Sequence, residues 1–297
     1  MTLFSIVFIL LLFIDCALKY YLNQRQISAI NRSFNQVPAA FHSQISLEEH
    51  HKAGRYSLAK LNLGKIELIY GVILVLIFTL SGGIDKIAQL TQFSHYPISS
   101  EVGLIIVYSL ISSALGLPLS YYSTFKIEQA FGFNKMTLGL FIKDLIKGTL
   151  LGMIIGVPLL YLVMWLMNSL GATWWLWVWG VMVIFNLLIL TIYPTFIAPL
   201  FNKFTPLEDL ELKARIETLL SECGFKSQGV FVMDGSKRSS HGNAYFTGLG
   251  ASKRIVFFDT LLKQLSHDEI IAVLAHELGH FKHKHILKQM LTSFGIM

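Results

Sequence analysis

Five long runs of apolar residues alternate with polar segments over the first two thirds of the chain. They cover residues 3–22, 66–80, 102–122, 149–167 and 174–193. A helix needs about 20 predominantly apolar residues to cross a bilayer, and these runs approach that length. We therefore predict a membrane domain of five transmembrane helices over residues 1–193. The first run is interpreted as an uncleaved helix, because no basic residue precedes it and no small-residue cleavage site ends it.

The pattern changes after the fifth run. Residues 207–223 carry apolar positions at helical spacing among charges, which predicts an amphipathic helix. Three short runs rich in β-branched and aromatic residues predict strands at 229–233, 243–247 and 254–259. A second helix is expected after Ser266, which has capping-box spacing to Glu269. Residues 194–285 are thus predicted to form a small α/β domain in the order helix, strand, strand, strand, helix.

Residues 286–297 become apolar again. We interpret them as the start of a truncated sixth transmembrane helix, because twelve residues are too few to cross a bilayer. The expected fold class is therefore an α-helical multi-pass membrane protein that carries a small α/β domain.

Composition and charge agree with a membrane protein. Hydrophobic residues make up 54% of the chain and charged residues only 14%, and the mean hydropathy is +0.58. The net charge of +6 would suit an anionic membrane surface or a nucleic acid. The distribution of the basic residues favours a different explanation, the orientation of the chain in the membrane. When successive polar segments are assigned alternately to the two sides of the membrane, 23 of the 24 Lys and Arg residues fall on one side. Only Lys86 falls on the other.

This asymmetry predicts that the N-terminus lies outside and that the α/β domain is cytoplasmic. No nucleic-acid partner is expected. The two cysteines, Cys16 and Cys223, fall in a membrane segment and in the polar domain. A disulfide framework is therefore not expected, which suits a domain in a reducing compartment.

The candidate chemistry lies in His276-Glu277-Leu278-Gly279-His280. On a helix, His276 and His280 project from one face, so their ring nitrogens can reach one zinc ion at about 2.0–2.1 Å. Glu277 lies beside them, where a carboxylate can take a proton from water bound to the metal. Gly279 costs about 1 kcal/mol of helix propensity relative to Ala, and a small residue there is understandable if another backbone passes close by. The alternative is a surface helix with two solvated histidines.

A catalytic zinc ion usually has three protein ligands, and only two are assignable. His283 and His285 follow on the expected helix, but a rise of roughly 10 Å over seven residues places them poorly for the same tetrahedral ion. Each is expected to be a helix-end cation or a group that supports a ligand. Asp259 and Glu269 have no spacing argument. We expect the third ligand to be a carboxylate on a later helix that this chain does not contain.

The predicted strand at 243–247 suggests how a peptide would be held. An exposed strand beside a zinc helix can bind a peptide by strand addition. Asn243 is expected either to bond the substrate backbone or simply to begin the strand, and the residues alone leave both interpretations open.

Three motifs together resemble one family. They are the zinc motif with His285 nine residues after its first histidine, residues 239–248 (SSHGNAYFTG) and residues 193–204 (YPTFIAPLFNKF). The chain resembles the CaaX prenyl protease 1 family, membrane zinc metallopeptidases of the Ste24 type in peptidase family M48. The resemblance covers nearly the whole chain. It implies a barrel of seven helices around an intramembrane chamber.

For the site, the resemblance implies that His276 and His280 bind zinc and that Glu277 is the general base. It also implies that Asn243 and Ala244 belong to a substrate-binding edge strand. In the family, a Glu after the sixth span supplies the third ligand. That segment is absent from the sequence, so we expect either a fragment or a truncated product.

The expected function is zinc-dependent hydrolysis of peptide bonds in membrane-associated or C-terminally processed, CaaX-type substrates. The expected partners are a peptide or protein substrate and the bilayer, and the oligomeric state is not predicted. The alternatives are an HtpX-like quality-control protease and a non-enzymatic scaffold or inactive homologue with an incomplete zinc site. For localisation, a bacterial inner membrane is expected rather than the endoplasmic reticulum membrane.

Overall fold

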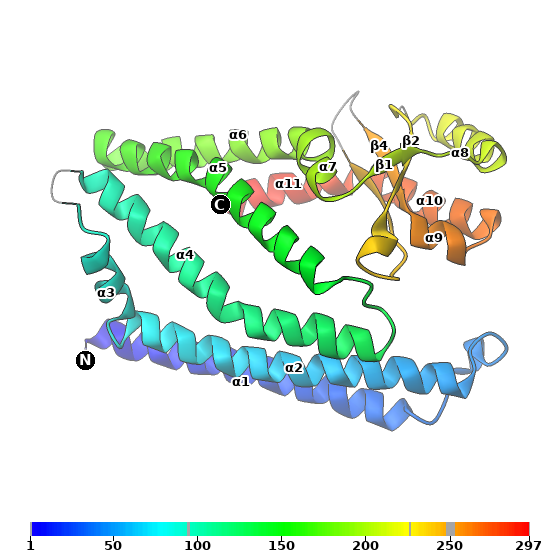
Figure 1. Ribbon diagram of the computed structural model, residues 1–297, viewed down its shortest axis with the longest axis horizontal. Helices are drawn as coiled ribbons and strands as arrows, with labels where there is room; N and C mark the ends of the chain where they lie inside the picture. Colours follow the sequence, from blue (N-terminus) through cyan, green and yellow to red (C-terminus); the bar gives the residue numbers. More distant parts are fainter. Residues whose placement is uncertain (1, 94–95, 226, 248–252, 297) are drawn as a thin grey trace. The chain divides into compact units, whose positions relative to one another are not determined.

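The computed structural model describes residues 2–93, 96–225, 227–247 and 253–296 (Figure 1). The chain folds into two compact units, Met1–Asn134 and Lys135–Met297, each of which is described by itself.

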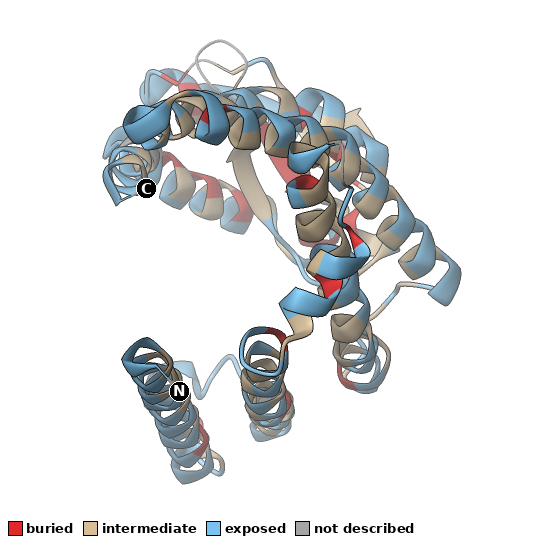
Figure 2. Ribbon diagram, turned by 90° about the vertical axis from the view of Figure 1, so that its left-hand side faces the viewer, coloured by how far each residue is buried: buried red, intermediate tan, exposed pale blue. Residues whose placement is uncertain are grey.

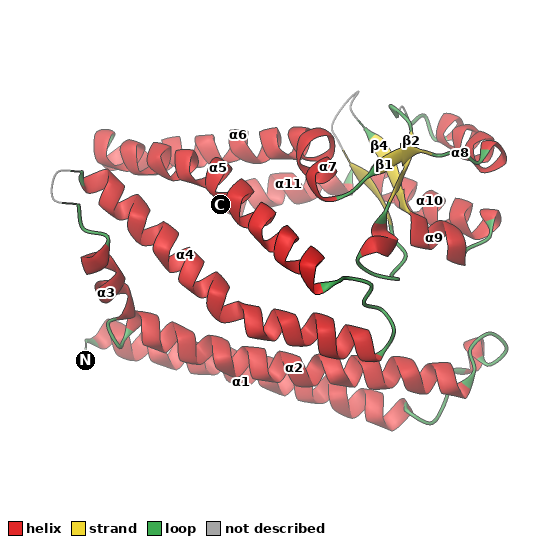
Figure 3. Cartoon of the chain, in the orientation of Figure 1, coloured by secondary structure: helices red, strands yellow, loops and turns green. Residues whose placement is uncertain are grey.

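Helices and loops make up the described part of the first unit (Figure 3). Its elements are α1 (Leu3–Ser33), a 3-10 turn η1 (Ala39–Phe41), α2 (Leu47–Thr79), α3 (Gly83–Leu90), α4 (Pro97–Tyr122) and a π-helical turn η2 (Ser123–Glu128) that continues α4. Helices α1 and α2 lie side by side as a hairpin (Figure 1). The Asn23 amide in α1 donates to the Leu61 carbonyl in α2 at 3.1 Å, which ties the two helices together.

A capping box starts α2. The Ser46 hydroxyl accepts from the Glu49 N–H, and the Glu49 carboxylate accepts from the Ser46 N–H. Farther along the helix, the Tyr56 hydroxyl donates to Glu128 at 2.6 Å, and Lys60 forms an ion pair with the same carboxylate at 3.3 Å. These contacts fasten α2 to the π-helical end of the α4 segment.

The second unit combines two long apolar helices with the predicted α/β domain. Its helical elements are α5 (Leu138–Ser169), η3 (Gly171–Thr173), α6 (Trp174–Ile192), η4 (Tyr193–Ile197), α7 (Ala198–Phe201), α8 (Leu210–Glu222), η5 (Gly235–Lys237), α9 (Asp259–Gln264), α10 (His267–Lys282) and α11 (His285–Ile296). Its strands are β1 (Phe204–Pro206), β2 (Val230–Met233), β3 (Ala244–Thr247) and β4 (Arg254–Phe258).

Each of the five predicted transmembrane runs coincides with one of five helical segments of 31 to 33 residues that are long and apolar enough to span a membrane, and only the second run, 66–80, extends past its segment, by one residue. The helices exceed the apolar runs because polar residues continue the same helix; α1, for example, runs on to Ser33. Many apolar side chains on these helices remain exposed, including Phe4, Ile154 and Ile184. Much of the ribbon in Figure 2 is accordingly pale blue, the colour of exposed residues. Apolar surface of this kind suits contact with lipid. The predicted boundaries at residues 193 and 285, the membrane role of 286–297 and the helical barrel remain predictions.

The sheet has the order β1-β2-β4-β3. Strand β2 is parallel to β4, and both outer pairs are antiparallel. The three predicted strands agree with β2, β3 and β4 to within one residue at each end. Strand β1 was not predicted, because three residues ending in Pro206 carry no alternation that marks a strand. Its proline lies in an edge strand, where a missing backbone N–H is tolerated.

The core of the α/β domain lies between the sheet and helices α8 and α10. Ile216 of α8, Phe257 of β4 and Ile270 of α10 are at most 1% exposed. Figure 2 marks the buried parts of the chain in red. Fully burying one such side chain contributes about 1.5–3 kcal/mol, so this cluster fixes α10 against the sheet.

Candidate metal centre

Helix α10 begins at the Ser266–Glu269 pair that the sequence predicted. The backbone N–H and the hydroxyl of Ser266 both donate to the Glu269 carboxylate at 2.8 Å. These two bonds hold the pKa of Glu269 below its ordinary value, and the bond from the backbone N–H has the larger effect. Arg215 of α8 pairs with Asp268 and lowers the pKa of that carboxyl group as well. The first turn of α10 is thus capped and tied to α8.

The apolar stripe of α10 decides which way the motif faces. Ile270, Leu274 and Leu278 recur every four residues and are 1–2% exposed. His276 follows Leu274 by two positions, which is about 200° around the helix. His276 and His280 therefore lie on the opposite, exposed side. Packing of the stripe holds both histidines on a rigid element.

The two imidazoles meet as a pair of metal ligands would. The Nε2 atoms of His276 and His280 are 3.2 Å apart, and the ring planes are inclined by 77°. Two nitrogens bound at about 2.0–2.1 Å to one tetrahedral zinc ion lie about 3.3 Å apart. The observed separation fits this geometry, so the two side chains are suited to hold one metal ion.

Glu277 is partly buried on the same helix. By helical geometry it lies on the flank between the histidine face and the apolar stripe. This position keeps its carboxylate near the metal-binding side and partly shielded from bulk water. The arrangement suits a general base that takes a proton from a reacting water molecule.

A third ligand is not assembled in the part of the chain that the structure describes. Within it, no group of three His, Cys, Asp or Glu side chains could hold a metal ion. Asp259 instead accepts hydrogen bonds from the N–H of Ser236, at 2.8 Å, and from its hydroxyl. The Glu269 carboxylate accepts a hydrogen bond from the Ser266 N–H at the start of α10. Both carboxylates that the sequence left open are therefore engaged elsewhere.

His283 and His285 do not continue along the zinc helix as expected. Helix α10 ends at Lys282, and α11 begins at His285. Lys284 lies between them with a φ of 53°, the only positive φ outside glycine among the described residues. The expectation for both histidines assumed one straight helix, and this turn overrides that assumption.

The turn brings His285 to the second zinc-motif histidine. The Nδ1 atoms of His280 and His285 are 2.9 Å apart. Partial removal from water, and then the neighbouring charges of His280, His283 and Lys288, lower the pKa of the His285 imidazole. His285 is thus a direct neighbour of a predicted ligand, as one of the two expectations for it held, although the turn that brings it there was not predicted.

The predicted substrate strand lies where it was expected, at the edge of the sheet. Ala244 begins β3 and pairs with Phe257 of β4. Strand β3 also contacts α10. The Asn243 side-chain oxygen accepts from the Ala244 N–H at 2.9 Å, and the Asn243 carbonyl accepts from the Phe258 N–H at 2.9 Å. These bonds show Asn243 as a strand-start residue, while its role toward a substrate remains a prediction.

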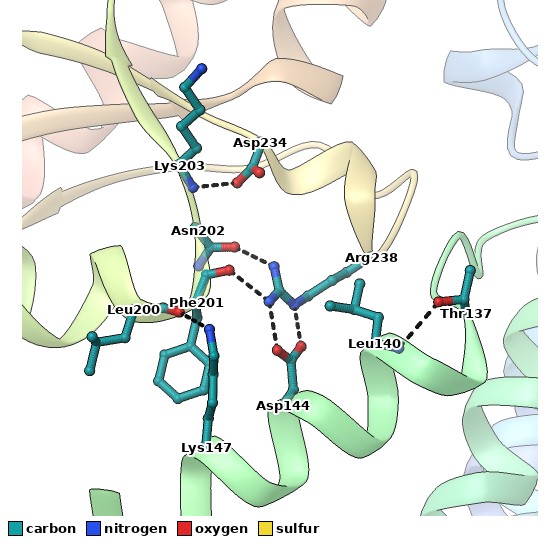
Figure 4. A network of polar contacts seen from close by, with 10 residues as sticks. All are labelled: Thr137, Leu140, Asp144, Lys147, Leu200, Phe201, Asn202, Lys203, Asp234 and Arg238. Carbon is teal, nitrogen blue, oxygen red and sulfur yellow. Dashed lines mark hydrogen bonds and ion pairs between the residues drawn. The ribbon is translucent and has the colours of Figure 1, made fainter.

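A polar network holds the loop before β3 in place (Figure 4). Arg238 donates to both carboxylate oxygens of Asp144 in α5, and also to the Asn202 side chain and the Phe201 carbonyl. The backbone carbonyl of Arg238 accepts from the Lys135 N–H at 3.0 Å. No sequence pattern marks this network, because its members come from separate segments of the chain.

Comparison with known proteins decides the family. The model described as "CAAX prenyl protease N-terminal, five membrane helices" matches residues 26–203, and that of peptidase family M48 matches residues 206–296. The chain belongs to the CAAX prenyl protease 1 family. The family's Saccharomyces cerevisiae protein, CAAX prenyl protease 1, is 40% identical over 285 residues, 92% of this chain and 62% of the relative. The Dictyostelium discoideum homolog is 39% identical over an alignment that spans 92% of this chain and 66% of the homolog.

A solved structure of the family agrees with the fold. The crystal structure of Ste24p from S. mikatae matches with a TM-score of 0.93 and 38% identity, over 99% of this chain and 70% of that chain. This confirms the predicted fold class and the CAAX prenyl protease resemblance. The match to the five-helix N-terminal model favours this family over the HtpX-like alternative.

The chain is shorter than its relatives. It spans just under two thirds of the length of the two curated proteins named above. Both of them, like the similar Arabidopsis thaliana homolog, are eukaryotic, so the expected preference for a bacterial inner membrane has no support.

Proposed function

We propose that this chain carries the zinc helix of a membrane-embedded endopeptidase that cleaves peptide bonds in membrane-associated or CaaX-type substrates. One observation carries the proposal. His276 and His280 present their Nε2 atoms 3.2 Å apart beside Glu277, on a helix that contacts the edge strand β3. Membership of the M48 peptidases supports the same interpretation.

In this proposal the two histidines bind zinc through Nε2, and a carboxylate outside the described residues supplies the third ligand. When bound, zinc supplies Lewis-acid chemistry, which makes water a stronger acid and polarises a carbonyl group. Packing of the apolar stripe of α10 fixes the helix that carries both imidazoles, so that little conformational entropy is lost when the ion binds.

Glu277 moves the proton. Its carboxylate takes a proton from the attacking water, whose oxygen forms a bond to the scissile carbonyl carbon. The carbon–nitrogen bond then breaks, and Glu277 gives the proton to the departing amine. The carboxylate is thus restored at the end of each cycle.

The substrate would lie along β3. An extended peptide can add to the edge of a sheet through main-chain hydrogen bonds, which accept many sequences. Ala244 offers a small side chain at the first position of the strand and Asn243 an amide beside it. A peptide bound in this way would have its cleaved bond near α10, and the contact between β3 and α10 supports this.

Two variants test the proposal. Purified protein in detergent is assayed for bound zinc and for cleavage of a farnesylated CaaX peptide. Glu277→Gln should keep zinc and lose cleavage by several orders of magnitude, since general-base catalysis alone contributes about 10²–10⁴-fold. Glu222→Gln, at an exposed position of α8, is the matched control and should behave as the wild type. Undiminished cleavage by Glu277→Gln would refute the role of Glu277.

A non-enzymatic scaffold is the second candidate. It is favoured by one observation, that the described residues assemble two zinc ligands and not three. The same zinc measurement separates the two functions. Stoichiometric zinc that disappears in His276→Ala supports the peptidase, whereas a wild-type protein without stoichiometric zinc supports the scaffold.

A further inference from the structure

Three histidines form a chain of ring-nitrogen contacts. His276 and His280 meet through their Nε2 atoms at 3.2 Å, and His280 and His285 meet through their Nδ1 atoms at 2.9 Å. Both nitrogens of His280 are therefore engaged, one toward the metal-binding side and one toward His285. The same pattern does not extend to His283, whose ring stacks on His285 with centroids 5.6 Å apart.

The two contacts of His280 impose a proton arrangement. A neutral imidazole carries one N–H, and a metal ligand must offer a bare nitrogen. If Nε2 of His280 faces the metal, its proton lies on Nδ1 and can be donated to Nδ1 of His285. His285 then carries its own proton on Nε2. Metal-binding histidines usually donate their second N–H to such a partner, which fixes the tautomer and the ring orientation.

The backbone is shaped to make this contact. His283 still closes a helical bond to the Gly279 carbonyl at 3.0 Å, and Lys284 then adopts a left-handed conformation with a φ of 53°. This conformation is unfavourable for a residue with a side chain, and such residues gather at functional sites. Without the turn, α10 would carry residue 285 onward along its axis and away from His280.

We propose that His285 is the positioning residue of the metal centre: by accepting the Nδ1–H of His280, it fixes the tautomer and orientation in which His280 binds zinc. The inference rests on the proposed function, because it assumes that His276 and His280 bind the metal. His285 itself does not touch the metal in this assignment.

The test measures zinc affinity by competition with a chromophoric chelator, on the full purified chain. His285→Ala should weaken zinc binding about 10- to 100-fold, the range found when such partners are removed. His285→Gln keeps an acceptor and should recover most of this loss. His283→Asn, the matched control in the same turn, should bind zinc within about twofold of the wild type.

The outcomes separate this inference from the proposed function. Wild-type affinity in His285→Ala, equal losses in the Ala and Gln variants, or an equal loss in His283→Asn would each overturn the role of His285. If the wild type and His276→Ala bind zinc equally weakly, the proposed function fails, and the inference fails with it.

One measurement needs no variant at position 285. Nitrogen-15 spectra of the zinc-loaded wild type, with the His280 signal assigned by its loss in His280→Gln, should show a proton on Nδ1 of His280. A proton on Nε2 would overturn the inference even if His285→Ala did not fold.

Discussion

Arg238 and Asp144 are 94 residues apart in the sequence, yet the guanidinium group of Arg238 meets both carboxylate oxygens of Asp144, at 2.8 and 3.0 Å. The two side chains are only about one-fifth exposed. This paired geometry is the one in which arginine binds a carboxylate most strongly. It joins helix α5 to the segment that leads into β3.

We expect Arg238→Lys to destabilise the protein by about 1.5–3 kcal/mol, because an ammonium group cannot make both parallel bonds. Lys237→Gln is the control, since Lys237 is exposed in the same turn, and it should stay within about 0.5 kcal/mol of the wild type. Chemical unfolding followed by circular dichroism measures both. Combining Arg238→Lys with Asp144→Asn should cost less than the sum of the single changes. Strict additivity would show that the pair is not coupled.

Acid should loosen the α/β domain through its carboxylates. Burial raises the pKa of Asp259, but hydrogen bonds from Ser236 outweigh it and lower the pKa below the ordinary 3.8. A carboxyl group with a lower pKa in the folded state stabilises the fold above its ordinary pKa, and this contribution disappears as the pH falls through the lowered value. We therefore expect the thermal unfolding temperature to fall when the pH drops below about 4.

Asp259→Asn isolates this contribution. The variant should be less stable than the wild type at pH 7, and the difference should shrink as the pH falls toward about 2. Glu222→Gln, at an exposed site, should follow the wild-type profile throughout. A stability difference between Asp259→Asn and the wild type that does not change with pH would contradict the assignment.

The two cysteines report on the predicted orientation. Cys223 is exposed at the end of α8, whereas Cys16 lies in α1, a candidate membrane span. Only a thiol that reaches water ionises and reacts readily. A membrane-impermeant maleimide should therefore label Cys223 from the cytoplasmic side of sealed vesicles, and Cys223→Ser should remove the signal. Cys16→Ser should not change it, and labelling of Cys223 from the outer side would refute the predicted topology.

Much of the fold could be predicted because its signals are local. The apolar runs marked all five long helices, and the runs at 229–233, 243–247 and 254–259 marked three of the four strands in the described part of the chain. Strand β1 was missed because it forms through pairing with β2 rather than through its own pattern. The order of the strands could not be predicted either, since it depends on contacts between distant segments.

The site divides in the same way. Helical spacing alone was enough to place His276 and His280 together, and the capping contact of Ser266 with Glu269 was also predictable. The contact of His285 was not, because it depends on one left-handed residue, Lys284. The role of Arg238 was equally hidden, since its side-chain partners lie in α5, at the end of α7 and directly after α7.

Gly279 has room for a larger side chain. A nearby backbone would have explained a small residue at this position, but a Cβ atom there would meet no described atom within 4 Å. Alanine is better than glycine in a helix by about 0.8–1.0 kcal/mol. We therefore expect Gly279→Ala to stabilise the protein by up to about 1 kcal/mol, measured by chemical unfolding. A loss of stability would mean that another segment packs against this position.

The same variant tests whether a bound substrate passes close to Gly279. The glycine lies between the two candidate zinc ligands, next to the face that would receive a substrate. If a peptide backbone passes over it, Gly279→Ala should raise the KM for a CaaX peptide while stability rises and zinc affinity stays the same. Gly139→Ala is a suitable comparison, because a Cβ there also meets no described atom within 4 Å, and it lies near the start of α5. Unchanged KM in Gly279→Ala would show that the substrate does not approach α10 at this point.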